Sequence, residues 1–425
     1  MAAYRIPSDV IAEILVCLPV RSLLRFKSVC KDWYTLINSS LFIQLHLNKS
    51  LVFNYRHNHT LFYTDYDSLC VVDDIYRPSK PIKVYYWPKD IIRNGLDDVH
   101  VDAIGSCNGL VCLCVTRDDA LYCSSILCFL ICNPSTRTFK FKPTLPFSEF
   151  NCPENEDLSC GFGYDGEHDD YKFVITHTYF KKNVRDNDVY IYSIKADLWK
   201  CATHTPAKGS TWSYFLKVED RVVYANNMLH YIAYSLVDDY NNDLIYLIAR
   251  FDMSSETWKD DLSFPAGVEG WKYIELEVLD DCLYLCLEER HGLHNVWVMK
   301  GYRDDDYSWS IMCKDLSVYC LGTWSPRGSH NLTLFAPLKE GTLRLLFVYT
   351  DFDCRGGTST HRVLWYNPHD ATTETFKLNL EQLSSNSLLR LCITSSLVTI
   401  PGSSFDYIEQ PGNDLDENKN HQLRF

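Results

Sequence analysis

The sequence predicts an α+β protein in which a small helical N-terminal domain precedes a much larger, mainly antiparallel all-β domain. Apolar residues recur at helical spacing near the N-terminus, and beyond about residue 100 short apolar segments alternate with polar turns. The composition supports this division, because 28 Tyr, 21 Phe and 10 Trp favour strands, on whose pleated surface aromatic side chains pack well. We expect the following divisions: the helical domain over 1–50, a transitional segment with the first strands over 51–100, the main β-domain over 101–400, and a partly disordered tail over 401–425.

The N-terminal pattern indicates three short helices. Pro7 and Ser8 are a natural start, and one face of the first helix carries Val10, Ile11, Ile14, Leu15 and Leu18. Pro19 ends this helix, and a second periodic set runs from Val20 to Ile37. A unit of this size buries too little surface to be stable with ease on its own, so we expect it to bind a protein partner.

A hairpin recurs through the β-domain: an apolar strand, a polar turn and then an aromatic residue. The aromatic residues follow one another at intervals of roughly 50–70 residues, and they are Phe139, Trp199, Trp258, Trp309 and Phe376. Such intervals are typical of propeller blades, where each aromatic packs between neighbouring four-stranded sheets. The double glycine of kelch blades occurs only at Gly356-Gly357, so the number of blades and the closure of the ring stay open.

The formal charge of −14 disfavours nucleic acid or an anionic membrane as a partner. The longest dense apolar run, Ile126 to Cys132, is far too short to span a bilayer. We therefore expect a cytoplasmic or nuclear protein, in which the 18 cysteines stay reduced and pack as small apolar side chains.

The N-terminal residues resemble a plant-type F-box: Ile6-Pro7-x-Asp9-Val10-Ile11-x-x-Ile14-Leu15-x-x-Leu18-Pro19-Val20, then Leu23-Leu24-Arg25-Phe26-Lys27-x-Val29-Cys30-Lys31-x-Trp33. The resemblance implies a three-helix module that docks on a Skp-type adaptor and, through it, on cullin and RING subunits. The implied interface or supporting residues are Ile6, Pro7, Ile14, Leu15, Leu18, Pro19, Val20, Leu23, Val29, Cys30 and Trp33. The alternative is a generic helical hairpin whose apolar residues are merely core.

The β-domain resembles the plant F-box-associated domain, which is kelch-like. The likeness is carried in order by Gly105-Ser106-Cys107-Asn108-Gly109-Leu110, Asn133-Pro134-Ser135-Thr136-Arg137, Gly161-Phe162-Gly163-Tyr164-Asp165 with Asp170-Tyr171-Lys172, and Val296-Trp297-Val298-Met299. This resemblance implies a non-catalytic subunit that recognises the target of an SCF ubiquitin ligase. S-locus F-box proteins, whose targets are the S-RNases of self-incompatibility, share the architecture. Two alternatives remain: a scaffold that binds the adaptor without driving degradation, and a sugar-binding propeller.

Two patterns imitate chemical sites, and we expect no catalytic residue, cofactor or metal ion. Gly161-x-Gly163-x-x-Gly166 matches a dinucleotide fingerprint, but strand-like residues follow where a helix is needed, so we interpret it as a turn with flexible glycines. Cys282 and Cys286, with His291 and His294, imitate a zinc site. On one strand, however, the two thiols would lie about 13 Å apart, too far for one zinc ion.

Acidic residues cluster in predicted turns of the β-domain. Singly, such turns are most often solvated loop tips, but several together create a potential that attracts a basic partner. As residues that bind the target we select Asp238, Asp239, Asp304, Asp305 and Asp306. The sequence thus predicts an unidentified, basic target protein.

Overall fold

The computed structural model shows helices at the N-terminal end and strands through the rest of the chain. The residues that the structure describes are 6–53, 60–65, 68–73, 82–86, 99–119, 123–143, 157–181, 184–203, 215–216, 222–236, 244–266, 271–279, 282–289, 293–301, 307–317, 345–352, 359–367, 372–376, 389–392, 396–401 and 403–405. Most of the expected tail, residues 406–425, and much of the transitional segment lie outside them.

The first N-terminal helices begin at the prolines predicted to mark their boundaries. The N-terminal helices are α1 (Ser8–Leu15), α2 (Val20–Phe26), α3 (Lys31–Asn38) and α4 (Ser40–Phe53). Pro7 and Pro19 stand at the N-caps of α1 and α2, where a missing N–H costs nothing. Cys30 caps α3, because its Sγ accepts a hydrogen bond from the backbone N–H of Trp33 at 3.5 Å.

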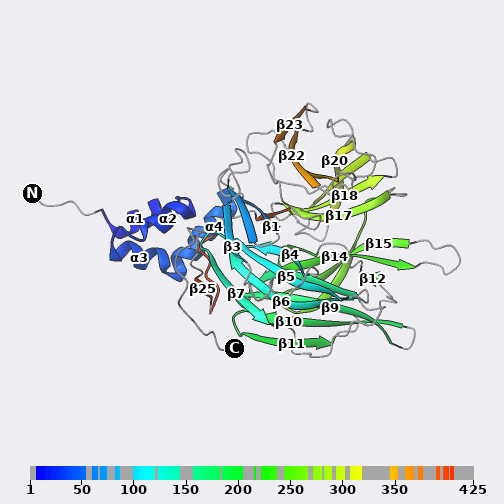
Figure 1. Cartoon of the computed structure of the whole chain (residues 1–425), viewed down its shortest axis with the longest axis horizontal. Coiled ribbons are helices and arrows are strands. Elements are labelled where there is room, and N and C mark those ends of the chain that lie inside the picture. Colours follow the sequence, from blue (N-terminus) through cyan, green and yellow to red (C-terminus); the bar gives the residue numbers. More distant parts are fainter. Residues whose placement is uncertain are drawn as a thin grey trace, which may run out of the picture.

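The expectation of three helices is incomplete, because α4 follows and runs past residue 50. This helix has no single apolar face: Phe42 lies in the core of the helical domain, while Ile43 and Leu47 pack on the β-domain. A helix buried on two sides shows no simple amphipathic period. Figure 1 shows α1, α2 and α3 projecting from the β-domain, with α4 at the junction.

The described strands form six antiparallel sheets, here called A to F. In order of hydrogen bonding, sheet A contains β24 (Leu389–Cys392), β1 (Thr60–Asp65), β2 (Ser68–Asp73) and β3 (Ile82–Tyr86). Sheet B contains β25 (Ser404–Phe405), β7 (Thr138–Pro143), β6 (Cys123–Asn133), β5 (Leu110–Asp119) and β4 (Val99–Cys107). Sheet C contains β11 (Leu198–Thr203), β10 (Val184–Ser193), β9 (Asp170–Lys181) and β8 (Asp157–Asp165).

The three remaining sheets repeat this pattern of consecutive hairpins. Sheet D contains β12 (Phe215–Leu216), β14 (Met228–Leu236), β15 (Leu244–Asp252) and β16 (Thr257–Ser263), and β13 (Val223–Ala225) also pairs with β14. Sheet E contains β17 (Trp271–Leu279), β18 (Cys282–Glu289), β19 (Leu293–Lys300) and β20 (Ser308–Ser317). Sheet F contains β21 (Leu345–Phe352), β22 (Ser359–Asn367) and β23 (Thr372–Phe376).

The sheets are arranged as a β-propeller, which confirms the predicted fold class. Strands of successive sheets are neighbours, since β1 contacts β4, β4 contacts β8, β8 contacts β13 and β13 contacts β17. Sheet A joins strands from the two ends of the β-domain, because β24 pairs with β1 in the register Thr60↔Cys392. The segment 51–100 contains β1, β2 and β3 and the beginning of β4.

Each described core cluster of the propeller lies between two consecutive sheets and contains one of the repeated aromatic residues. Phe139 packs between sheets A and B, and Trp199 packs between sheets B and C. Trp258 packs between sheets C and D, and Trp309 between sheets D and E. The predicted role of these four aromatics is confirmed, whereas the side chain of Phe376 lies outside the described residues.

The repeated turn before each aromatic has one geometry in sheets B, C and D. A side chain six residues before the aromatic accepts hydrogen bonds from turn amides: Asn133 from the N–H of Ser135, and Asp252 from the N–H groups of Ser254 and Ser255. Ser193 Oγ does the same for the N–H of Ala196. The fourth turn residue has positive φ, at 56° for Arg137, 55° for Asp197 and 55° for Glu256. The sequence repeat is therefore a repeat of turn geometry.

The interpretation of Gly161 and Gly163 as flexible turn residues is wrong, because both lie in β8. A Cβ on Gly161 would lie 2.8 Å from a Val222 methyl group, and one on Gly163 would lie 2.3 Å from the Tyr224 ring. Only a strand without these side chains lets sheet D approach so closely. Close packing, and neither a turn nor a nucleotide, explains these two glycines.

We expect Trp199→Ala and Trp258→Ala each to lower the free energy of unfolding by about 2–4 kcal/mol, because both side chains are half-buried between two sheets and truncating a fully buried aromatic costs about 3–5 kcal/mol. Denaturant melts of the full chain measure the change. The matched control is Leu198→Ala, since the side chain of this neighbour on β11 is 51% exposed. A loss below about 1 kcal/mol for both tryptophan variants would contradict their place between the sheets.

Candidate functional site

The helical domain exposes apolar side chains on one face of α1. Val10 and Ile14 lie one helical turn apart and are 42% and 53% exposed, and Ile6, just before the helix, is 59% exposed. Together with the exposed Pro7 these residues form what we call the docking face. An apolar face of this kind is typical of a surface that binds another protein.

The residues predicted to bind the adaptor divide into two groups. Those that are exposed are Ile6, Pro7, Ile14, Pro19, Val29 and Cys30. Those that are buried in the core of the helical domain are Leu15, Val20 and Leu23, while Leu18 and Trp33 are half-buried and pack against the same core. The first group is available to a partner, and the second group gives the helices their arrangement.

The corner of Leu18 and Pro19 is held in place by α4. The Leu18 carbonyl accepts a hydrogen bond from His46 Nε2 at 2.9 Å. Burial lowers the pKa of His46, although the hydrogen bond to this carbonyl acts in the opposite direction. Lys49 Nζ donates to Cys17 Sγ at 2.8 Å beside the same corner. Sequence reasoning missed these contacts, because they join residues about thirty positions apart.

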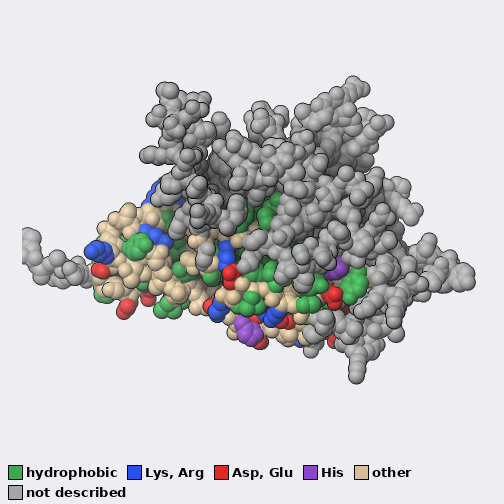
Figure 2. Space-filling view, turned by 60° about the horizontal axis from the view of Figure 1, so that its bottom comes forward, with side chains coloured by type: hydrophobic (Ala, Val, Ile, Leu, Met, Phe, Trp, Pro, Cys, Tyr) green, Lys and Arg blue, Asp and Glu red, His purple; other side chains and the backbone are tan. Residues whose placement is uncertain are grey.

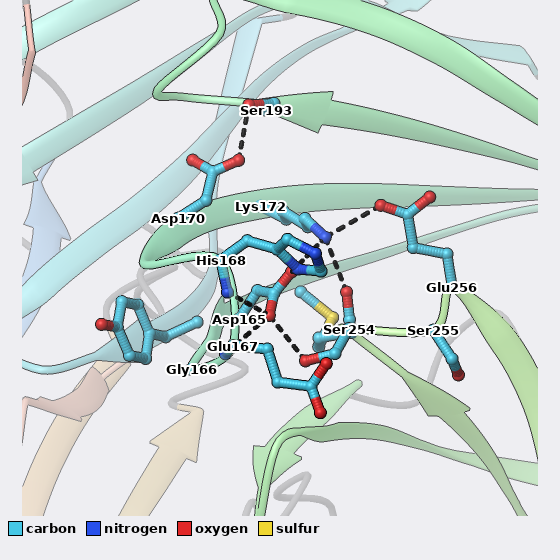
Figure 3. A network of polar contacts seen from close by, with 12 residues as sticks. Asp165, Gly166, Glu167, His168, Asp170, Lys172, Ser193, Ser254, Ser255 and Glu256 are labelled. Atoms are coloured by element: carbon cyan, nitrogen blue, oxygen red, sulfur yellow. Dashed lines mark hydrogen bonds and ion pairs between the residues drawn. The ribbon is translucent and has the colours of Figure 1, made fainter.

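A buried network of polar side chains lies between sheets C and D (Figure 3). Lys172 Nζ, on β9, donates to Asp165 Oδ2 at 2.5 Å, to the Met253 carbonyl at 2.7 Å and to Glu256 Oε1 at 2.8 Å. Ser254 Oγ donates to Asp165 Oδ1 at 2.6 Å. The turn between β15 and β16 is thereby attached to the β8–β9 hairpin.

The charges in this network stabilise one another. Burial acts to raise the pKa of Asp165, but hydrogen bonds from Lys172, Ser254 and His168 outweigh it and hold that pKa well below its usual range. Burial acts to lower the pKa of Lys172, yet the hydrogen bonds to Asp165 and Glu256 raise it overall. The side chain of Asp165 is 0% exposed and that of Lys172 is 6% exposed, so each charge depends on its partner.

The network explains a motif that the sequence offered only as a likeness. Asp165 and Lys172 belong to the Gly-Phe-Gly-Tyr-Asp and Asp-Tyr-Lys segments, and Asp170 of the second segment accepts hydrogen bonds from Ser193 and Lys195. All these contacts join hairpins or sheets. The motif therefore has a structural role in fastening sheet C to sheet D.

The residues of the imitated zinc site do not meet in the structure as far as it describes them. Cys282 and Cys286 both lie on β18, and Cys286 is buried opposite Glu275 of β17. His291 lies outside the described residues. Among the described residues no three His, Cys, Asp or Glu side chains gather in an arrangement that could hold a metal ion.

The five aspartates predicted to bind the target lie outside the described residues. Asp238 and Asp239 fall between the paired ends Leu236 and Leu244 of β14 and β15. Asp304 to Asp306 fall between the paired ends Lys300 and Ser308 of β19 and β20. On the face shown in Figure 2, the described acidic and basic side chains are interspersed.

The structure thus defines a two-domain protein, in which a small helical domain with an exposed apolar face precedes a β-propeller. Residues 4–45 match the F-box domain, and residues 50–334 match the F-box associated beta propeller domain. The chain belongs to the family of F-box proteins with this propeller domain. In the described part of the chain, the helices are too short or too polar to cross a membrane.

Curated proteins of Arabidopsis thaliana are similar over most of the chain. The F-box/kelch-repeat protein At3g23880 is 29% identical over 323 residues, which cover 72% of this chain and 78% of that protein. The F-box protein CPR1 is 29% identical over 329 residues, covering 72% and 71%. Among solved structures, TolB from Acinetobacter baumannii is 8% identical with a TM-score of 0.40, covering 83% of this chain and 73% of that one.

We expect Asp165→Asn to lower the free energy of unfolding by about 3–5 kcal/mol at pH 7, because Lys172 then keeps a buried charge without its main partner. Urea melts measure the loss, and Glu167→Gln, at an exposed position of the same turn, is the control.

The loss should depend on pH in a defined direction. The folded-state pKa of Asp165 lies below the unfolded value of about 3.9, so its contribution is present above that value and disappears as pH falls through the folded pKa. The difference between wild type and Asp165→Asn should therefore shrink below about pH 4. A difference that stays constant down to pH 2 would contradict the assignment.

Proposed function

We propose that this chain is the subunit of an SCF ubiquitin ligase that recognises the target. Its helices bind a Skp-type adaptor, which connects it to the cullin and RING subunits, and its propeller binds the protein to be ubiquitinated. The observation that carries the proposal is the exposed apolar docking face on helices that match the F-box domain. An exposed apolar face on a small domain is stabilised when a partner covers it.

The exposed and the buried residues of the helical domain contribute differently to the recognition of the adaptor. Ile6, Pro7 and Ile14 supply apolar area that the adaptor can cover, and Pro19, Val29 and Cys30 extend it at the two interhelix corners. The buried residues Leu15, Val20 and Leu23, with Leu18 and Trp33, support the backbone beneath. Adaptor affinity thus depends on both groups, but only the first loses area directly to the partner.

The mechanism is tethering. One end of the chain holds the ligase and the other holds the target, so the acceptor lysines stay at a high effective concentration near the transferring subunits. Catalysis takes place on those subunits and not on this chain. F-box proteins in general are non-catalytic subunits of this kind.

The target is recognised through acidic turns of the propeller and is basic where it binds. An S-RNase is one candidate of this charge. The strand registers indicate that the two acidic sets follow opposite ends of equivalent strands. In sheet D, Asp238 and Asp239 follow the Leu236–Leu244 pair, at the end away from the Met228–Asp252 pair. In sheet E, Asp304 to Asp306 follow the Lys300–Ser308 pair, at the end that also carries the β17–β18 connection. One small target is therefore expected to use Asp238–Asp239 or Asp304–Asp306, but not both.

We expect the combined change of Pro7, Leu18 and Pro19 to Ala to weaken adaptor binding at least about 100-fold, because apolar anchors dominate interfaces of this kind. Co-purification and titration with a Skp-type adaptor measure it. The control changes Leu41, Leu45 and Leu51 to Ala, three exposed leucines of α4 that lie beyond the motif from Ile6 to Trp33. Undiminished adaptor yield from the first variant would show that the docking residues are misassigned.

We also expect charge reversal at one acidic set to slow association with the target, and reversal at the other to have little effect. The two variants carry Lys at 238 and 239, or at 304, 305 and 306. The target is a protein that is captured both by the full-length chain and by a chain lacking residues 1–50, which keeps the propeller. Its association rates are measured from low to high salt, since salt screens such attraction. Rates indifferent to salt and to both variants would contradict recognition by the acidic turns.

A further inference from the structure

The C-terminal part of the chain touches three parts of the molecule in succession. β24 completes sheet A by pairing with β1, and β25 pairs with the outer strand β7 of sheet B in the register Ser404↔Phe139. Between them, residues 396–400, which we call the strap, lie against the helical domain. In Figure 1, β25 is seen at the end of the β-domain from which the helices project. The strap lies beyond residue 334, where the match to the propeller family ends.

Neighbouring side chains of the strap belong to two different cores. Leu397 is 3% exposed and packs in the helical core with Leu15, Val20 and Phe42. Val398 and Ile400 are 7% and 3% exposed and pack in the cluster between sheets B and C. The strap thus fills the space between the two domains, as α4 does through Ile43 and Leu47.

One side chain of the propeller holds the strap by its backbone. Asn133 is 0% exposed, and its Nδ2 donates to the Ser396 carbonyl at 3.0 Å and to the Val398 carbonyl at 2.9 Å. Its Oδ1 accepts the turn amides of Ser135 and Thr136. Both ends of this amide are therefore used, one for the turn and one for the strap.

The equivalent positions in the next two sheets share the contact with the turn amides but not the contact with the strap. Asp252 and Ser193 accept turn amides as Asn133 does. A carboxylate has no N–H, so the Asp at this position in sheet D can satisfy the turn but cannot donate to a passing backbone. Among these three residues, only Asn133 has the two amide N–H groups that donate to the two strap carbonyls.

We propose that the strap locks the helical domain onto the propeller, and that Asn133 is the positioning residue that holds it there. The pairing of β24 with β1 brings the strap to the helical domain, and the strap with α4 fixes the direction of the docking face. The consequence for ubiquitin transfer rests on the proposed function: adaptor and target are held at a constant separation instead of on a flexible linker.

The test is hydrogen exchange of the full-length chain, read by mass spectrometry over peptides from α4 and residues 396–401. Asn133→Ala should speed exchange there at least tenfold, although Asn133 does not belong to α4. The matched control is Asp252→Ala, which removes the same type of turn contact and should leave exchange of α4 and the strap unchanged. A purely local role of Asn133 predicts faster exchange in β6 and β7 alone, and that result would overturn the proposal.

Two further measurements keep the test decisive if Asn133→Ala does not fold. Leu397→Ala releases the strap from its other side and should speed exchange of the same α4 peptides. In the wild type, α4 and the strap should open as one unit, with the same rate and the same dependence on urea. Rates that differ by more than tenfold between the two segments would overturn the proposal without any variant.

The adaptor is measured separately. Asn133→Ala should keep adaptor affinity within about twofold, because the docking face is unchanged and only its attachment is loosened. A wild-type chain that binds no adaptor would refute the proposed function. The exchange rates would still decide whether the strap holds the helical domain on the propeller. A variant that loses both adaptor binding and α4 protection would show that Asn133 supports the helical fold itself, which contradicts a positioning role.

Discussion

The structure depends on one constraint: each small sheet has apolar side chains on both faces and must be covered by the next sheet. The clusters around Phe139, Trp199, Trp258 and Trp309 each join two consecutive sheets, so no described sheet from A to E has a core of its own. Trp309 shows the arrangement in a single contact, because its Nε1 donates to the Ser263 carbonyl of the preceding sheet at 2.8 Å. Stability in such an array resides in the interfaces between repeats.

The interface between sheets C and D shows how polar groups are accommodated under that constraint. Gly161 and Gly163 let the sheets approach closely, and the approach removes water from Asp165 and Lys172. Two charges in such a place are tolerated only when they are paired and hydrogen-bonded, which Ser254 and Glu256 help to achieve. The close approach that the two glycines allow therefore also buries the ion pair. The ion pair in turn holds the turn of sheet D in register with the hairpin of sheet C.

The helical domain meets the same constraint by a different route. Its core is completed by Phe42 of α4 and by Leu397 from the far end of the chain, so it is not covered by its own three helices alone. Its docking face, in contrast, stays exposed around Ile14. In the proposed function, a helical domain attached to the propeller on one side would keep its open docking face pointing in one direction.

The local pattern of the sequence determined the helices α1 to α3, the repeated hairpins and the fold class. These features depend on residues close in the chain: Pro7 and Pro19 bound helices, and Asn133, Ser193 and Asp252 begin the same turn six residues before an aromatic. The F-box motif also identified the candidate docking residues, although it could not separate exposed Ile14 from buried Leu15. Tertiary structure alone decided the role of α4, the packing role of Gly163 and the partners of Lys172 and Asn133. Those roles arise from contacts between residues far apart in the sequence, such as Asn133 and Val398, which are 265 positions apart. No local period or composition records which distant backbone a side chain will meet.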